Sequence, residues 1–153
     1  MSNPHFTMPN VRVVVADASK ARYFRVDSPT GELIELSQDA NPEGRMYNRE
    51  LISDSRGEQT SHARDSRSVV DESNDPKNVE IQRFARSIAD KLDKERTQGS
   101  LEKLYVIAPP KFLGELRHHM KPALKSVVVE EINKDLANME AHELRKQLPE
   151  RLK

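Results

Sequence analysis

Apolar and polar positions divide the first part of the chain into three short segments typical of β-strands. The run VRVVVA at residues 11–16 is continuously apolar apart from one arginine, and RYFRV follows at 22–26 after the short polar connection DASKA. A turn signal, SPTG at 28–31, precedes ELIEL at 32–36, where polar and apolar residues alternate as in a half-buried strand. The pattern predicts an antiparallel meander of three strands.

A strongly amphipathic helix is predicted for residues 75–99. Asp75 suits the N-cap position, Pro76 suits the first helical position, and Gly99 provides a stop signal at the other end. Apolar side chains with helical spacing form one stripe along it: Ile81, Phe84, Ile88 and Leu92. We therefore expect one face of this helix to pack on the sheet.

The second half of the chain continues with alternating strands and helices. The apolar run KLYVIA at 103–108 lacks polar alternation, as expected for a strand buried on both faces. Because it follows a helix, it is predicted to run parallel to the first strand. A helix starts at the Pro-Pro pair 109–110 and is interrupted at Pro122, a fifth strand is predicted at 126–132, and a terminal helix at 142–153.

This order of elements, β-β-β-α-β-α-β-α, predicts an α/β fold with a mixed five-stranded sheet flanked by helices. It is also the order found in ribonuclease H-like nucleases. The length of 153 residues is most simply one domain, residues 1–153. Residues 39–75 show no sustained period, so we expect a long loop inside this domain that is functional, mobile or both.

Charge and composition narrow the classes of partner and compartment. Lysine plus arginine equal aspartate plus glutamate at 25 each, so any binding surface for an anion is a local patch. The absence of cysteine excludes disulfides, thiolate zinc sites and cysteine nucleophiles. The N-terminal MSNPHFTMPN has neither a basic start nor an apolar run, and no stretch approaches the roughly 18 apolar residues of a membrane helix. We expect a cytoplasmic protein with no membrane insertion.

A two-metal nuclease is the sharpest enzymatic hypothesis for this order of elements. Its metals need carboxylates from the first strand, the first helix and the end of the fourth strand. Asp17 fits the first role, but the fourth strand ends in Ala108-Pro109-Pro110, which offers no carboxylate. By default Asp17 is a turn residue or helix cap, and the Pro-Pro junction is structural. Close packing against the sheet is the explanation we expect for Gly114 in the following helix.

Other catalytic patterns are missing from the sequence. His118 and His119 are adjacent, so on a helix they point about 100° apart and cannot clasp one metal as an i, i+4 pair would. There is no Gly-x-Ser-x-Gly elbow and no glycine-rich phosphate loop. We expect no catalytic set, no metal site and no cofactor, which favours a non-enzymatic binding module.

The long loop carries five arginines and no lysine between residues 40 and 68. Guanidinium groups bind phosphate bidentately and stack on bases, which favours an RNA-facing loop. Five carboxylates in the same stretch balance these charges, so a solvated loop with local ion pairs is an equally valid interpretation. The candidate binding residues are Arg45, Arg49, Arg56, Gly57, Glu58, Gln59, Arg64 and Arg67.

Five segments together resemble the bacterial family named "protein required for attachment to host cells". They are VVVADASKARYF, ELISDSRG, IQRFARSIADKL, LYVIAPPKFLGELR and INKDLANMEAHEL, in this order and spread from residue 13 to 144. The family name describes a genetic phenotype and implies little about molecular activity. Because the sequence shows no export signal, we expect any effect on attachment to be indirect.

The family in turn looks like the middle domain of archaeal and eukaryotic peptide-release factors, which implies association with ribosomes or RNA. In those factors a Gly-Gly-Gln tip on the corresponding loop helps water attack the peptidyl ester. Gly57 and Gln59 match the outer positions, but Glu58 adds a Cβ and a negative charge at the central one, which argues against release activity. The alternatives are a protein-interaction or regulatory module whose loop folds on a partner, and an ester hydrolase acting on peptidyl-tRNA through Gln59 or Asp17.

Overall fold

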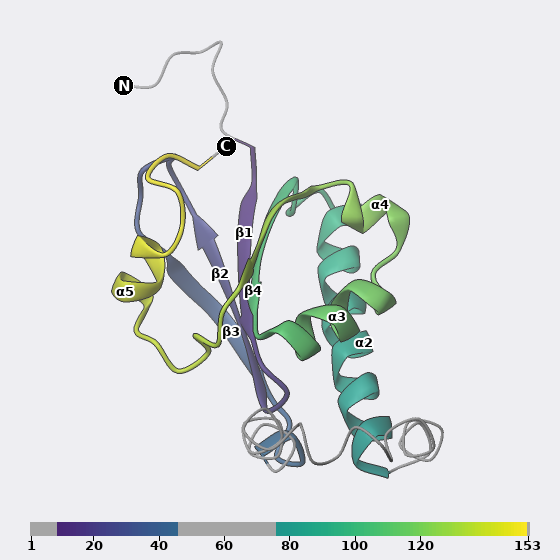
Figure 1. The fold of residues 1–153 in the computed structure, drawn as a ribbon. Helices are drawn as coiled ribbons and strands as arrows, with labels where there is room; N and C mark the ends of the chain where they lie inside the picture. The colour runs from purple at the N-terminus through teal and green to yellow at the C-terminus, as the bar shows by residue number, and fades with distance from the viewer. Residues whose placement is uncertain (1–8, 46–75, 153) are drawn as a thin grey trace.

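The computed structural model describes residues 9–45 and 76–152, apart from the side chains of residues 76 and 77. Within these residues five strands form one sheet, and four labelled helices accompany it (Figure 1). The strands are β1 (Val11–Ala16), β2 (Lys20–Val26), β3 (Ile34–Ala40), β4 (Lys103–Ala108) and β5 (Val128–Asn133). The helices are α2 (Pro76–Thr97), α3 (Pro110–His119), α4 (Pro122–Lys125) and α5 (Ala141–Lys146).

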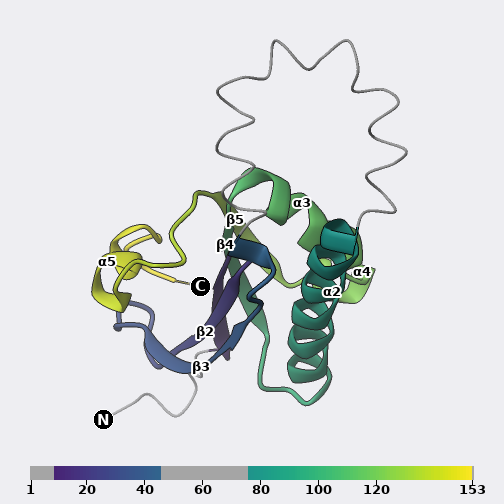
Figure 2. The same ribbon diagram turned by 90° about the horizontal axis from the view of Figure 1, so that it is seen from below.

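The sheet has the order β3-β2-β1-β4-β5. Strands β1, β2 and β3 pair antiparallel, whereas β4 pairs parallel with both β1 and β5. Helices α2, α3 and α4 cover one face and α5 lies against the other, so the sheet forms the middle layer (Figures 1 and 2). This arrangement confirms the predicted mixed, ribonuclease H-like α/β fold.

The central position of β1 explains its apolar sequence. Val14 and Ala16 join the apolar cluster beneath α2 and α3, while Val11, Val13 and Val15 join the cluster beneath α5. All five are at most 1% exposed, because helices cover the sheet on both sides. Burying one such valine contributes about 1.5–3 kcal/mol, so the run fixes β1 as the centre of the fold.

Helix α2 follows the prediction closely. Ile81, Ile88 and Leu92 of the predicted stripe are at most 1% exposed, and Phe84 is 9% exposed. Gly99 adopts φ +85° just past the helix, where glycine alone is unstrained, and this ends the helix as predicted. The proposed N-cap, Asp75, lies outside the described residues. No helix in the described parts of the chain is both long and apolar enough to cross a membrane.

The Pro-Pro junction after β4 has the structural role that the sequence predicted. Pro109 is the N-cap of α3 in an extended conformation, Pro110 occupies the first helical position, and the carbonyl of Pro109 accepts the first helical hydrogen bond from Leu113 at 2.8 Å. The explanation expected for Gly114 is wrong: a Cβ placed there meets no atom within 4 Å. Close packing therefore does not require glycine at this position.

Three predicted boundaries are also corrected by the structure. Strand β3 covers Ile34–Ala40 instead of 32–36, because Gln38, Asp39 and Ala40 continue the ladder with β2 although they lack apolar alternation. The long loop therefore starts after Ala40. Strand β5 starts at Val128, two residues later than predicted, because the preceding residues complete the turn of α4.

Helix α5 ends at Lys146 and does not continue to residue 153. Pro149 disfavours helical geometry at the residue before it and has no N–H to donate, which limits the helix at this point. Residues 148–152 instead run back to the β2–β3 turn, where the N–H of Leu152 donates to the carbonyl of Pro29 at 2.7 Å.

Candidate functional site

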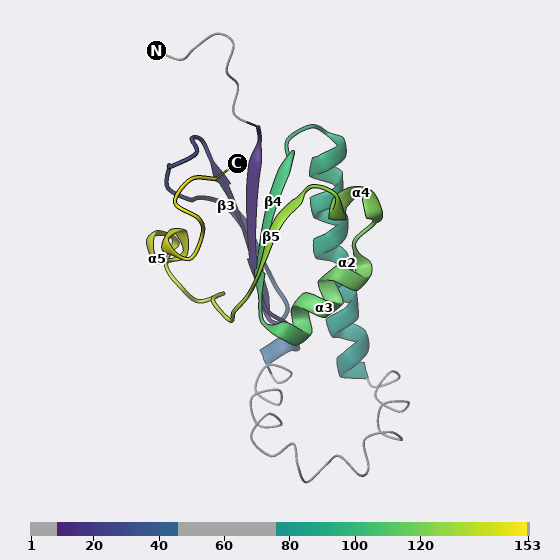
Figure 3. The same cartoon turned by 45° about the horizontal axis from the view of Figure 1, so that its top comes forward.

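The carboxyl ends of β1, β3, β4 and β5 lie at one edge of the sheet, where open α/β sheets commonly bind ligands. We call this the carboxyl edge, and it comprises the turn 17–20, the stem 41–45, the junction 109–111 and the loop 134–139. Residues 41–45 and the start of α2 both lie at this edge (Figure 3). The described residues next to the arginine-bearing segment of the sequence, residues 40–74, therefore lie at the carboxyl edge on both sides of it.

Asp17 shapes the turn between β1 and β2. It is 4% exposed, and its Oδ1 accepts hydrogen bonds from the N–H groups of Ser19 and Lys20 at 2.7 and 2.9 Å. The Ser19 hydroxyl donates to the same oxygen at 2.8 Å. Three donors on one carboxylate oxygen are typical of a turn residue, which agrees with the default interpretation of Asp17.

The stem is fastened to this turn by Asn41. Asn41 is 8% exposed, its Nδ2 donates to the carbonyl of Ala18 at 2.9 Å, and its N–H donates to the carbonyl of Ser19 at 2.7 Å. Gly44 then turns back through an N–H bond of 2.9 Å to the Asn41 carbonyl. Sequence reasoning did not single out Asn41 or Gly44, although the segment NPEG is rich in turn formers.

Arg45 is the one arginine of the proposed binding loop that the structure describes. It is exposed at the end of the stem, and its N–H donates to the carbonyl of Pro42 at 3.3 Å. The other candidate residues lie outside the described part of the chain: Arg49, Arg56, Gly57, Glu58, Gln59, Arg64 and Arg67.

A second carboxylate at the carboxyl edge, Asp135, was missed by the sequence reasoning. Asp135 is exposed on the surface, but part of its surroundings is protein. This partial burial is the larger cause, and the negative charge of Asp17 the smaller cause, of a pKa above the ordinary value for Asp135. Its position after β5, at the end of a parallel strand, was the available signal. Within residues 9–45 and 76–152 no group of three or more histidine, cysteine or acidic side chains is placed to hold a metal. The described residues thus supply no two-metal cage.

The adjacent histidines near the end of α3 do not form such a group either. The rings of His118 and His119 are nearly perpendicular, with centres 5.1 Å apart. Nε2 of His119 is buried without a hydrogen-bond partner and lies 4.0 Å from a Glu115 carboxylate oxygen.

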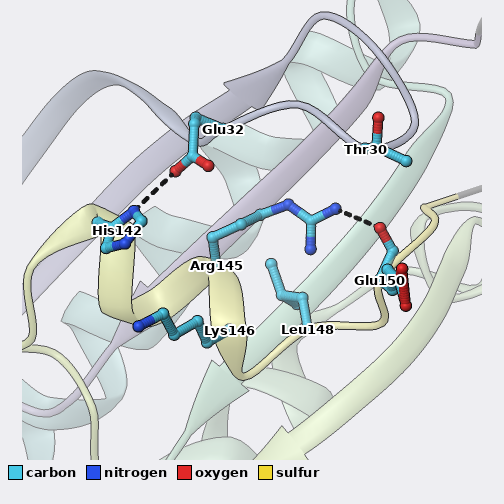
Figure 4. A pocket seen from close by; sticks show the side chains of 7 residues that line it. All are labelled: Thr30, Glu32, His142, Arg145, Lys146, Leu148 and Glu150. Atoms are coloured by element: carbon cyan, nitrogen blue, oxygen red, sulfur yellow. Dashed lines mark hydrogen bonds and ion pairs between the residues drawn. The ribbon is translucent and has the colours of Figure 1, made fainter.

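An open pocket of about 520 Å³ lies beside α5 (Figure 4), on the opposite face of the sheet from α2 (Figure 1). Its centre is Arg145, which is 8% exposed and donates to the main-chain carbonyls of Pro29, Gly31, Pro149 and Glu150 at 2.7–3.2 Å. At its rim, Nδ1 of His142 stands 3.3 Å from Oε1 of Glu32. The pocket is lined by Thr30, Glu32, His142, Arg145, Lys146, Leu148 and Glu150.

The guanidinium of Arg145 joins the C-terminal segment to the β2–β3 turn. Four of its hydrogen bonds go to neutral main-chain oxygens, so most of its donors are already used inside the protein. The role that these contacts indicate is structural, and the carboxyl edge remains the candidate functional site.

A family model described as "Protein required for attachment to host cells" matches residues 12–148. The chain belongs to this family. The match includes the turn at Asp17, the stem, the Pro-Pro junction and α5, so the carboxyl edge is part of the domain that defines the host-attachment family.

A relative in Rickettsia prowazekii (strain Madrid E), "Uncharacterized protein RP470", is 40% identical over 62 residues. The aligned part covers 39% of this chain and 41% of that protein. The name of this relative states no activity.

The solved structures to which the chain is similar include the archaeal translation termination factor aRF1. That match covers 92% of this chain and 35% of the factor, with 9% identity and a TM-score of 0.48. The Ppx/GppA phosphatase of Aquifex aeolicus matches over 82% of this chain and 36% of its own, with 12% identity and a TM-score of 0.40. This member of the host-attachment family thus spans about a third of the length of each of these two proteins.

Proposed function

We propose that this chain is a non-enzymatic module that binds RNA, on the ribosome or free, through the arginine-bearing segment 40–74. The observation that carries the proposal is the placement of the stem 41–45 and of the start of α2, between which that segment runs in the sequence, at the carboxyl edge, the usual ligand-binding edge of an open α/β sheet. A role on ribosomes places the protein in the cytoplasm.

The chemistry of the segment favours RNA over a small ligand. Five arginines without a lysine provide planar donors that bind phosphate and stack on unpaired bases. The chain has no net charge, so these contacts are local and require the segment itself. The described residues around its ends include no group of three or more histidine, cysteine or acidic side chains placed to hold a metal, which favours binding over metal-dependent catalysis.

Ribosome co-sedimentation at several salt concentrations tests the proposal. Five phosphate contacts to single-stranded RNA are expected to weaken binding about 100-fold between about 50 and 200 mM salt. A variant with Arg45, Arg49, Arg56, Arg64 and Arg67 replaced by glutamine should lose both the affinity and the steep salt dependence. Arg25→Gln is the matched control, because Arg25 is a half-buried arginine near the opposite end of β2, away from the carboxyl edge. Absence of binding at low salt, or equal binding of the variant, would falsify the proposal.

Peptidyl-tRNA hydrolysis is the enzymatic alternative, with Gln59 or Asp17 as the reacting residue. Asp17 already accepts three hydrogen bonds at Oδ1, which does not favour a role as general base. The Gln59 version predicts hydrolysis by the purified protein that Gln59→Ala abolishes. Unchanged hydrolysis in that variant removes it.

A protein-interaction module remains the alternative from another class. Pull-down of partners before and after nuclease treatment separates the two, because only contacts made through RNA are lost on digestion. In the RNA proposal, the contribution to attachment that the family name describes is indirect and acts through gene expression.

A further inference from the structure

The stem between β3 and the arginine-bearing segment is held in place by two unlike features. Asn41 supplies hydrogen bonds: its side chain donates to the Ala18 carbonyl at 2.9 Å and its main chain donates to the Ser19 carbonyl at 2.7 Å. Asp17 in turn fixes the conformation of the turn that contains both carbonyls. The stem therefore rests on a turn whose own shape is set by a buried carboxylate.

Gly44 allows the backbone of the stem to lie directly against the backbone of the β1–β2 turn. A Cβ built on Gly44 would stand 1.8 Å from the carbonyl oxygen of Ala18 and 2.6 Å from the main-chain nitrogen of Ser19. These are backbone atoms at the centre of the sheet's edge and cannot rotate away. Any larger residue at position 44 must displace the stem from the turn, together with the exposed Arg45 that follows directly.

We propose that Asn41 and Gly44 are positioning residues that hold Arg45 at the carboxyl edge for contact with an RNA phosphate. This inference rests on the proposed function. It assigns a supporting role to two uncharged residues, which act through Arg45 and not by contact with the RNA. A guanidinium attached to a fixed stem loses less conformational freedom on binding phosphate than one on an unattached chain. The contribution of Arg45 to binding thus depends on the two residues before it.

The test compares Arg45→Gln, Asn41→Ala, Gly44→Ala and the double variant Asn41→Ala/Arg45→Gln in binding to poly(U) RNA and to bacterial ribosomes. Arg45→Gln should lower the slope of log affinity against log salt by about 0.7 to 1, which is one phosphate contact. Asn41→Ala and Gly44→Ala should each reproduce most of this change, and the double variant should lose no more than Arg45→Gln alone. This non-additivity is a signature that a general loss of stability does not produce.

Two matched controls separate positioning from destabilisation. Gly114→Ala is a glycine substitution into open space, and Ile132→Val shortens a buried side chain in the apolar cluster beneath α5. Both should bind with the wild-type slope. If Ile132→Val lowers the melting temperature as much as Asn41→Ala while retaining the slope, stability is not the cause.

The outcomes distinguish this inference from the proposed function. If the variant lacking all five arginines loses binding but Asn41→Ala and Gly44→Ala keep the wild-type slope, the positioning role is wrong and the proposed function stands. The same holds if Arg45→Gln has no effect. If the variant lacking all five arginines binds like the wild type, both fail.

Discussion

Replacing Tyr23 with phenylalanine tests the network that fastens β3 to α2. Tyr23 lies in β2 and is 2% exposed, and its hydroxyl donates a hydrogen bond of 3.0 Å to Oδ2 of Asp39 in β3. Nζ of Lys91 in α2 stands 4.0 Å from the centre of the Tyr23 ring and 3.5 Å from the same carboxylate oxygen. Phenylalanine keeps the buried ring and its contact with the ammonium group, so the substitution removes only the hydroxyl.

The expected loss of stability follows from the environment of the acceptor. A hydrogen bond to a charged group contributes about 1.5–3 kcal/mol. The side chain of Asp39 is 42% exposed, so water partly replaces the lost donor and the value lies below this range. We expect Tyr23→Phe to lower the free energy of unfolding by about 1 kcal/mol at neutral pH, which corresponds to about 2–4 °C in melting temperature.

The difference in stability between the wild type and Tyr23→Phe should also depend on pH, which provides a second, independent test. Burial, followed by the charge and hydrogen bond of Asp39, raises the pKa of Tyr23 well above its ordinary value of 10.0. Above pH 10 the unfolded chain releases this proton and the folded chain keeps it, so the wild type loses about 1.4 kcal/mol per pH unit from this group. Tyr23→Phe lacks this loss, and the two stability curves should cross near about pH 11.

Urea unfolding followed by circular dichroism between about pH 7 and 11 measures both effects. A double-mutant cycle of Tyr23→Phe with Asp39→Ala should give a coupling energy of about 1 kcal/mol if the hydrogen bond is the cause. Equal stability of Tyr23→Phe and the wild type at neutral pH would refute the argument. Parallel curves above pH 10 would refute the part that concerns ionisation.

Three further substitutions address other contacts. Asp135→Asn should raise the free energy of unfolding at pH 7, because a raised pKa means that the charged carboxylate of Asp135 destabilises the folded state. In urea titrations this gain in stability should vanish below the ordinary pKa of 3.8, and a gain independent of pH would contradict the argument. Gly114→Ala should raise the free energy of unfolding by about 1 kcal/mol in thermal melts, since this mid-helix glycine faces open space. A lower stability of the variant would instead show that position 114 requires a residue without a Cβ. Arg145→Met should lower the free energy of unfolding by about 3 kcal/mol and expose the C-terminal segment to proteolysis, because four main-chain carbonyls lose their donor. If the variant resists proteolysis as well as the wild type does, Arg145 does not hold this segment in place.

Local patterns in the sequence were sufficient to predict the strands and helices of the core. The β-branched run of β1, the apolar run of β4 and the helical stripe of α2 each express burial directly, so their type and approximate bounds are correct. Strand β3 was misplaced because it lies at the edge of the sheet and most of its residues are exposed, so it has no apolar signature beyond Leu36. Pairing with β2, which is a property of the backbone, extends it to Ala40.

The contacts at the carboxyl edge could not be predicted in the same way. Asn41 meets Ala18 across 23 positions, and Asp135 approaches Asp17 across a still longer separation. The pattern of apolar residues in the sequence does not indicate which turns lie close together in space, because their proximity depends on the order of the strands and on the crossover connection. The types of residue were visible, since asparagine, glycine and aspartate cluster in turns, but their partners follow only from the folded sheet.

The two outer strands show features that oppose a different mode of partner binding, the addition of a further strand to the sheet. Both interrupt their ladders with an unpaired residue, Leu36 in β3 and Val129 in β5, and these side chains are 41% and 40% exposed. A bulge twists the edge and breaks the regular row of donors that an added strand would need. A negative charge next to the β5 bulge, on Glu130, further disfavours pairing of two copies through that strand, since like charges would then face each other. Strand addition is thus opposed on both sides of the sheet, whereas at the carboxyl edge Asn41 and Gly44 hold a fixed stem that ends in an exposed cation.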